Sequence, residues 1–161
     1  MSIYDISIFD LSDLRRVQLE SFTEFLCFKL GTTARKLQKY YNERLSRYGI
    51  TIAQSFIILS LIEKGPSNVK DLAARLEIDS SAITGLVDRL EREGLVTRQT
   101  NPKDRRAFLI NLTEKGEKLG QKLKPIASEF NEKIKSGLSK SELNAVLKFF
   151  SVMEEIDSKG K

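Results

Sequence analysis

Hydrophobic residues recur every three or four positions through most of the chain, which predicts a mainly α-helical protein. The first such segment spans residues 14–48 and predicts one long helix, or two helices that meet near Ser21. Gly49 is expected to end this segment, because glycine favours the backbone that closes a helix. Thr51 and Gln54 then form a capping box ahead of an apolar run, which predicts the start of another helix.

The pattern changes twice in the middle of the chain. Two short amphipathic segments come first, and two short apolar strands follow them on either side of a polar loop. The expected elements are helices at 69–76 and 80–92 and strands at 95–98 and 107–112. Ser67 suits the cap of the first of these helices, and Asp79 suits the cap of the second. This order predicts a winged helix-turn-helix, in which the small β-hairpin is the wing.

Two more helices are expected in the C-terminal third. Thr113 suits the cap of the first, and Gly137 is expected to end it in a left-handed conformation. Ser139 and Glu142 form a capping box at the start of the last helix. The apolar residues that this helix is expected to bury are Leu143, Val146, Leu147, Phe150 and Met153. The predicted organisation is an N-terminal helical dimerisation region at 1–49, a winged helix-turn-helix at 50–113 and C-terminal dimerisation helices at 114–161.

The outer helices carry more apolar residues than a small winged-helix core can cover. The surplus consists of Phe22, Phe25, Leu26, Phe28 and Leu30 at one end and Phe149, Phe150, Val152 and Met153 at the other. Intertwining of the terminal helices in a two-fold homodimer would bury these side chains. A monomeric bundle is the alternative.

The second helix of the helix-turn-helix has two contrasting faces. One face is apolar, and the opposite face carries small or polar residues that fit the major groove of duplex DNA. The candidate DNA contacts on this helix are Ser80, Ser81, Thr84, Gly85 and Arg89. An ordinary solvent-exposed face is the alternative interpretation, and the basic loop that follows favours DNA.

That loop places positive charge at the expected tip of the wing. Lys103, Arg105 and Arg106 surround Asp104, and an arginine on such an arm suits a narrow, electronegative minor groove. At the start of the preceding helix, the backbone N–H groups from Ser67 to Lys70 and the Lys70 side chain are candidate phosphate contacts.

Composition excludes several other classes of function. The chain has no histidine and one cysteine, so it lacks a Ser-His or Cys-His pair, an imidazole metal ligand and an internal disulfide. No glycine-rich phosphate loop, membrane-spanning stretch or export signal is visible. We therefore expect a cytoplasmic protein that is not an enzyme and has no cofactor or bound metal.

The segment LAARLEIDSSAITGLVDRLEREGLVTRQTNPKDRRAFLINLTEKG resembles the MarR family of transcriptional regulators. The most specific parts are LxxxGLVxR and DRR followed by LTEKG. The resemblance implies a winged-helix homodimer that binds pseudo-palindromic double-stranded DNA, usually as a repressor released by a small ligand or an oxidant. By position, Asp104 and Arg106 correspond to the family's wing pair. A winged-helix protein-protein interaction module of a transcription complex is the competing hypothesis.

The first helix is also similar to the organic-hydroperoxide-sensing branch of that family. In this resemblance Cys27 falls at the position of the oxidation sensor, and Tyr41 at one tyrosine that holds it. Ile52 and Gly31 stand where two other supporting aromatic residues would be, so a buried apolar role for Cys27 remains open.

A small phenolic or other aromatic effector is the other candidate signal. The expected pocket lies between the first two helices and the wing domain. Its candidate lining residues are Tyr40, Tyr41 and Tyr48.

Overall fold

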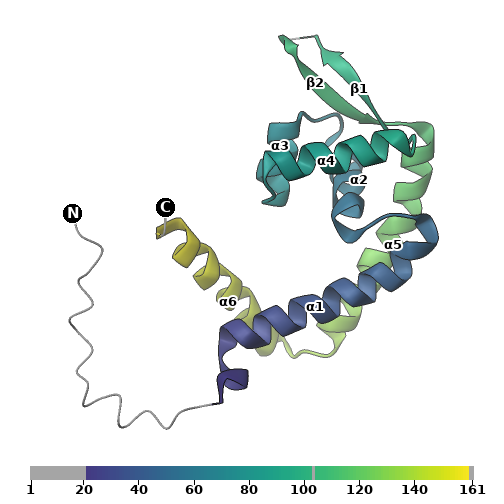
Figure 1. Ribbon diagram of the computed structural model, residues 1–161. Helices are drawn as coiled ribbons and strands as arrows, with labels where there is room; N and C mark the ends of the chain where they lie inside the picture. Colours follow the sequence, from purple (N-terminus) through teal and green to yellow (C-terminus); the bar gives the residue numbers. More distant parts are fainter. Residues whose placement is uncertain (1–20, 103, 160–161) are drawn as a thin grey trace, which may run out of the picture. The chain divides into compact units, whose positions relative to one another are not determined.

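The computed structural model describes residues 21–102 and 104–159, which form two compact units (Figure 1). One unit ends at Gly49 and the other begins at Ile50. The mainly α-helical architecture with a two-stranded wing confirms the predicted fold class.

The first unit contains a long helix with a short helical turn at each end. These elements are η2 (Phe22–Glu24), α1 (Leu26–Leu45) and η3 (Ser46–Tyr48). Phe25 has an extended backbone, so the break occurs four residues after the predicted position near Ser21. Gly49 adopts φ 69°, which confirms the predicted end of the segment. Residues 14–20 lie outside the described part of the chain.

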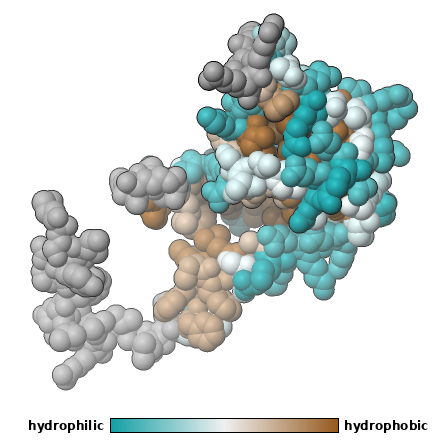
Figure 2. Space-filling model, turned by 45° about the horizontal axis from the view of Figure 1, so that its top comes forward, coloured by the Kyte–Doolittle hydropathy of each residue, from teal (hydrophilic) through white to brown (hydrophobic). Residues whose placement is uncertain are grey.

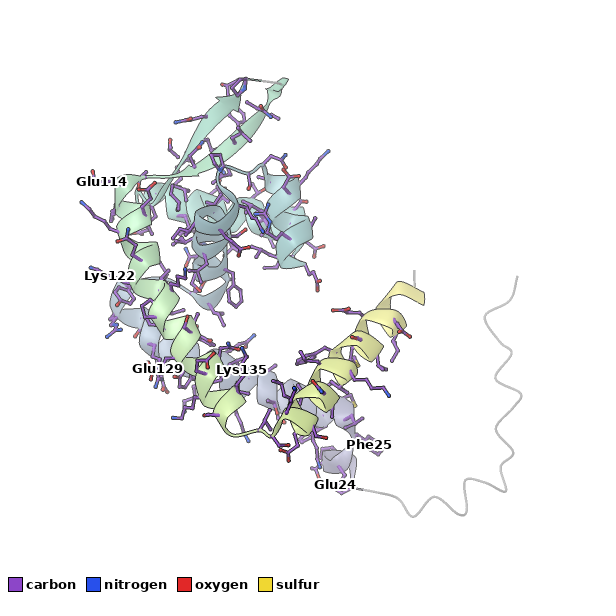
Figure 3. The ribbon with its side chains drawn as sticks, turned by 180° about the vertical axis from the view of Figure 1, so that it is seen from behind. Glu24, Phe25, Glu114, Lys122, Glu129 and Lys135 are labelled. Carbon is purple, nitrogen blue, oxygen red and sulfur yellow. The ribbon has the colours of Figure 1, made fainter. Side chains whose placement is uncertain are left out.

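The second unit contains the winged helix-turn-helix and the C-terminal helices. Its elements are α2 (Ile52–Lys64), α3 (Val69–Leu76), α4 (Ser80–Arg92), β1 (Val96–Asn101), β2 (Asp104–Leu112), α5 (Glu114–Ser136) and α6 (Lys140–Lys159). Charged residues are spaced along the whole length of α5, as Glu114, Lys122, Glu129 and Lys135 show in Figure 3.

Three of the predicted helix starts have the expected capping contacts. Thr51 and Gln54 bond reciprocally at the start of α2. The Thr113 hydroxyl accepts the Gly116 N–H at 3.1 Å, and Ser139 pairs with Glu142 ahead of α6. The hydrogen bonds from the Ser139 hydroxyl and backbone lower the pKa of the Glu142 carboxyl.

Two predicted terminal features are wrong. Asp79 precedes α4, but its side chain makes no capping hydrogen bond. Gly137 ends α5 with φ −85°, a right-handed conformation, so the expected left-handed cap is absent there. The Gly137 N–H instead bonds the carbonyls of Ile134 and Lys135, which tightens the last turn without a positive φ.

The wing is an antiparallel hairpin that is longer than its apolar pattern predicted. Val96 pairs with Leu112 at its base, and Asn101 pairs with Asp104 near its tip. The polar residues Gln99 and Thr100 continue β1 because backbone pairing does not require apolar side chains. Hydrophobicity alone therefore located the base of the hairpin and missed its outer half.

The core of the second unit forms around α2. This helix packs against α3, α4, α5 and β2, and its residues Ile57 and Ile58 are fully buried. Fully buried side chains on the surrounding elements are Leu72, Ile83, Val87, Leu90 and Ile110. The same core therefore fixes α4 and the wing relative to one another.

Within a single chain, α6 remains mostly exposed. Val146, Leu147, Phe150 and Met153, which were expected to be buried, are 37–54% exposed. On the helical segments of the first unit, Phe22 and Leu26 are 64% and 67% exposed. A single chain therefore leaves these apolar surfaces exposed to solvent.

Among the described helices, none is long and apolar enough by itself to cross a membrane. The helical segments 26–48 and 52–64 satisfy that length and composition test only when they are taken together.

Candidate DNA-binding site

Helix α4 presents one apolar and one polar face, as its sequence predicted. Ile83, Val87 and Leu90 are fully buried, whereas the polar face is open to solvent. The exposed candidate contacts are Ser80, Ser81, Thr84, Gly85 and Arg89. A helix anchored along one face and polar along the other has the form that major-groove recognition requires.

Thr84 and Gly85 give this polar face specific properties. The Thr84 hydroxyl donates to the Ser80 carbonyl at 2.8 Å, so its oxygen lone pairs remain available to accept a bond. A Cβ at Gly85 would have no neighbour within 4 Å, so internal packing does not explain the glycine. The bare backbone at this point would allow close approach to a ligand.

The wing is attached to α4 by an ion-pair cluster that the sequence did not reveal. The Arg98 guanidinium on β1 donates to the carboxylates of Asp88 and Glu91 on α4. The hydrogen bond to Asp88 is the main reason that the pKa of Arg98 is raised. Asp88, on the exposed face of α4, therefore helps to connect this helix to the wing.

The start of α3 differs from its prediction. Asn68, not Ser67, caps the helix and accepts the Asp71 N–H at 2.9 Å. Ser67 is 4% exposed, and its backbone forms a bridge with Ile110 that draws it toward the core. The Ser67 hydroxyl also accepts a hydrogen bond from the Arg75 guanidinium at 3.4 Å. The Ser67 N–H donates to the Ile110 carbonyl at 3.2 Å, so neither the backbone N–H nor the side chain of Ser67 is open to a phosphate.

Lys70, the other candidate from this region, is exposed in the first turn of α3. At the wing tip, the backbone of Asp104, Arg105 and Arg106 belongs to β2. Their side chains lie outside the described part of the structure. The proposed minor-groove contacts therefore remain predictions.

The candidate sensor and effector residues lie on the first unit. Cys27 is exposed in the first turn of α1, not buried as its apolar interpretation expected. Tyr40 and Tyr41 make an edge-to-face contact with ring centroids 5.5 Å apart. Partial burial, followed by the effect of Tyr40, raises the pKa of Tyr41. The Arg44 guanidinium lies 3.5 Å from the Tyr40 ring centroid.

Tyr48 is half-buried beside Arg47, whose guanidinium lies 4.9 Å from its ring centroid. The structure thus brings Tyr40 and Tyr41 together on α1. It does not test the expected pocket between the two units.

Comparison with known proteins identifies the family. The MarR family model matches residues 50–108. The HTH-type transcriptional regulator MgrA of Staphylococcus aureus is 31% identical over 130 residues, which cover 77% of this chain and 86% of that protein. The chain belongs to the MarR family. It is therefore a DNA-binding transcriptional regulator of a non-enzymatic family, as the sequence predicted.

A second MarR-type relative is the organic hydroperoxide resistance transcriptional regulator of Bacillus subtilis. It is 37% identical over 97 residues, which cover 60% of this chain and 66% of that protein. This match places a peroxide-resistance regulator among the chain's relatives, in agreement with the similarity of the first helix.

Solved structures confirm the MarR-like fold. Reduced AbfR bound to DNA matches with a TM-score of 0.67 and 26% identity over 84% of this chain and 92% of that one. Bordetella bronchiseptica BpsR, whose DNA binding is regulated by 6-hydroxynicotinic acid, matches with a TM-score of 0.74 and 24% identity. That match covers 84% of this chain and 96% of BpsR.

Proposed function

We propose that this MarR regulator is a homodimeric repressor that binds pseudo-palindromic operators through α4 and the wing. The exposed polar face of α4 supports this proposal. Burial of the opposite, apolar face anchors the helix, and Arg98 links the helix to the wing. This arrangement presents a helix and a hairpin together, as recognition of adjacent major and minor grooves requires.

Each candidate contact has a distinct proposed role. Ser80, Ser81 and Thr84 contact base edges or phosphates in the major groove, while Gly85 lets the backbone approach. Arg89 contacts a phosphate or a base edge, and Lys70 contacts a phosphate. Arg105 and Arg106 contact the minor groove, with Asp104 beside them.

Dimerisation is supported by the exposed apolar surfaces of the terminal helices. Leu147 and Phe150 on α6 are 54% and 52% exposed, and Phe25 before α1 is 50% exposed. Exposed apolar area of this extent is usual at an interface and costly in solvent. A two-fold dimer would bury it and would place two copies of α4 on one operator.

Release from DNA is proposed to follow either ligand binding or oxidation of Cys27. A phenolic or other aromatic effector, held near Tyr40, Tyr41 and Tyr48, would act by favouring one separation of the two α4 helices. For the oxidation route, the exposure of Cys27 within a single chain and the hydroperoxide-resistance relative provide support.

Removal of one wing arginine tests the DNA-binding assignment. Duplexes selected from random DNA by the wild-type protein should bind Arg106→Ala more weakly, because alanine cannot reach into the minor groove. Sedimentation should show that the variant keeps the oligomeric state of the wild type. Equal affinity of both proteins for the selected duplex would contradict the proposed role of the wing.

Hydroperoxide treatment tests the oxidation route separately. The wild-type protein should release the selected duplex after treatment, whereas Cys27→Ser should remain bound because it lacks the oxidisable thiol. Equal release of both proteins, or release of neither, would exclude Cys27 as the sensor. Either result would leave DNA recognition by α4 and the wing intact.

A further inference from the structure

The second unit contains an open cleft of about 760 Å³ between the start of α3, α4 and the wing. Lys70 lines its α3 side, Thr84 its α4 side, and Phe108 its wing side. In the space-filling view, an apolar patch lies close to the wing among polar residues (Figure 2). A cation, a hydroxyl and an exposed aromatic ring therefore line the same cleft.

The register of the hairpin determines which way Phe108 points. Arg98 pairs with Ile110, and Thr100 pairs with Phe108. Directly paired residues and residues two positions apart share a face of a β-ribbon. Because Arg98 reaches α4 from this face, Phe108 also leaves the hairpin on the side of α4.

Along this face, burial ends abruptly at Phe108. Ile110 is fully buried, whereas the Phe108 side chain, one pleat farther toward the tip, is 54% exposed. A phenyl ring left half in water beside a cleft gains free energy when apolar surface covers it. Internal packing of the described residues does not supply that cover.

The charges in the cleft indicate what could cover the ring. Lys70 is an exposed cation, and the nearby Asp88 carboxylate is already paired with Arg98. A DNA strand alternates anionic phosphates with apolar deoxyribose surfaces, so one segment of backbone could satisfy both Lys70 and Phe108.

We propose that this cleft holds the backbone of one DNA strand between the grooves occupied by α4 and the wing. Lys70 binds a phosphate, and the Phe108 ring packs on an adjacent deoxyribose. This inference rests on the proposed DNA-binding function and adds an apolar contact that contributes affinity without neutralising charge.

Salt-dependent binding separates the two contacts. Affinity for a duplex selected by the wild-type protein should be measured at several salt concentrations for Phe108→Ala and Lys70→Gln. Phe108→Ala should weaken binding about tenfold for each bound protomer and leave the salt slope unchanged. Lys70→Gln should reduce the slope of log K against log salt by about 0.9 for each phosphate that is no longer neutralised.

Two further variants control for damage to the wing. Phe108→Leu keeps apolar surface and should bind within about threefold of the wild type. Leu109→Ala shortens the neighbouring apolar side chain, which leaves β2 on the opposite face, and should bind better than Phe108→Ala. Thermal unfolding of each variant measures any loss of folding.

The outcomes distinguish this inference from the function on which it rests. If the wild type binds and Phe108→Ala binds equally well, or weakens only as much as Leu109→Ala, the cleft does not hold DNA. A changed salt slope in Phe108→Ala would also contradict the apolar contact. If the wild type selects no duplex, both the proposed function and this inference are wrong.

Discussion

At the scale of single residues, Gly116 on α5 has no room for a side chain. A Cβ at this position would lie 2.0 Å from the Leu95 carbonyl oxygen, at the base of the wing. At Gly120 a Cβ would meet the Ile62 Cδ1 atom at the same distance. The first obstacle is backbone, whereas the second is the end of a side chain that can rotate.

Because the two obstacles differ, alanine should lower the free energy of unfolding by different amounts at Gly116 and Gly120. Gly116→Ala should lower the free energy of unfolding by about 1–3 kcal/mol, because the Leu95 backbone must move. Gly120→Ala should cost less, since Ile62 is 41% exposed and can shift. Urea unfolding at one fixed protein concentration measures both. Identical midpoints for Gly116→Ala and the wild type would contradict the close approach.

Glu77 provides a second residue-scale prediction. It ends α3 with φ 53°, a left-handed conformation that is unfavourable for a residue with a Cβ. Glu77→Gly should raise the free energy of unfolding by about 0.5–1 kcal/mol. The free energy gained by removing the left-handed strain should exceed the entropic cost of a more flexible unfolded chain. A lower unfolding midpoint for the variant would show that the Glu77 side chain stabilises the turn.

Helix caps show how far local sequence determines structure. Thr51, Thr113 and Ser139 were predicted correctly because each precedes a clear helical pattern. Ser67 was not, because its backbone pairs with Ile110 far along the chain and leaves Asn68 to cap α3. Such tertiary pairing overrides local preference and cannot be read from neighbouring residues.

At the scale of elements, the apolar pattern predicted the two faces of α4 but not the connection to the wing. That connection depends on Arg98 and two carboxylates that come together only after the hairpin folds back on α4. Sequence periodicity describes which side of a helix is buried. It does not specify which exposed charges pair across elements.

Arg98→Gln should therefore weaken DNA binding mainly by loosening the wing. Its ion pairs are partly exposed and contribute little to global stability, so the unfolding midpoint should change only slightly. Hydrogen exchange of the β1 and β2 amides should become faster, while that of the buried face of α4 should not.

Arg92→Gln is the matched control for this variant. Arg92 lies on the exposed side of α4, so its replacement removes the same charge without breaking the connection to the wing. Equal acceleration of exchange in the wing of both variants would contradict a specific role for Arg98.

At the scale of the whole molecule, the apolar surplus of the terminal helices was visible in the sequence. The structure adds that α6 leaves it exposed, with Ile156 at 60%. Sequence patterns could show that a partner surface is needed. They could not specify its geometry, because the contacts lie outside a single chain.

Charge on the apolar face of α6 should prevent dimerisation. Phe150→Glu should sediment as a monomer, because an unpaired carboxylate is costly to bury in an apolar interface. Asn144→Glu adds the same charge on the polar face of the helix and should remain dimeric. A dimeric Phe150→Glu protein with wild-type affinity would place the interface elsewhere.

In the proposed dimer, two copies of α4 and the wing read one duplex together. The most direct test is selection from random DNA, followed by binding to selected sites with altered spacing. Two inverted half-sites should emerge about 10 base pairs apart, and insertion of five base pairs should abolish high-affinity binding by turning one half-site to the opposite side of the helix. A single asymmetric site, or affinity that is unchanged by the insertion, would contradict paired recognition.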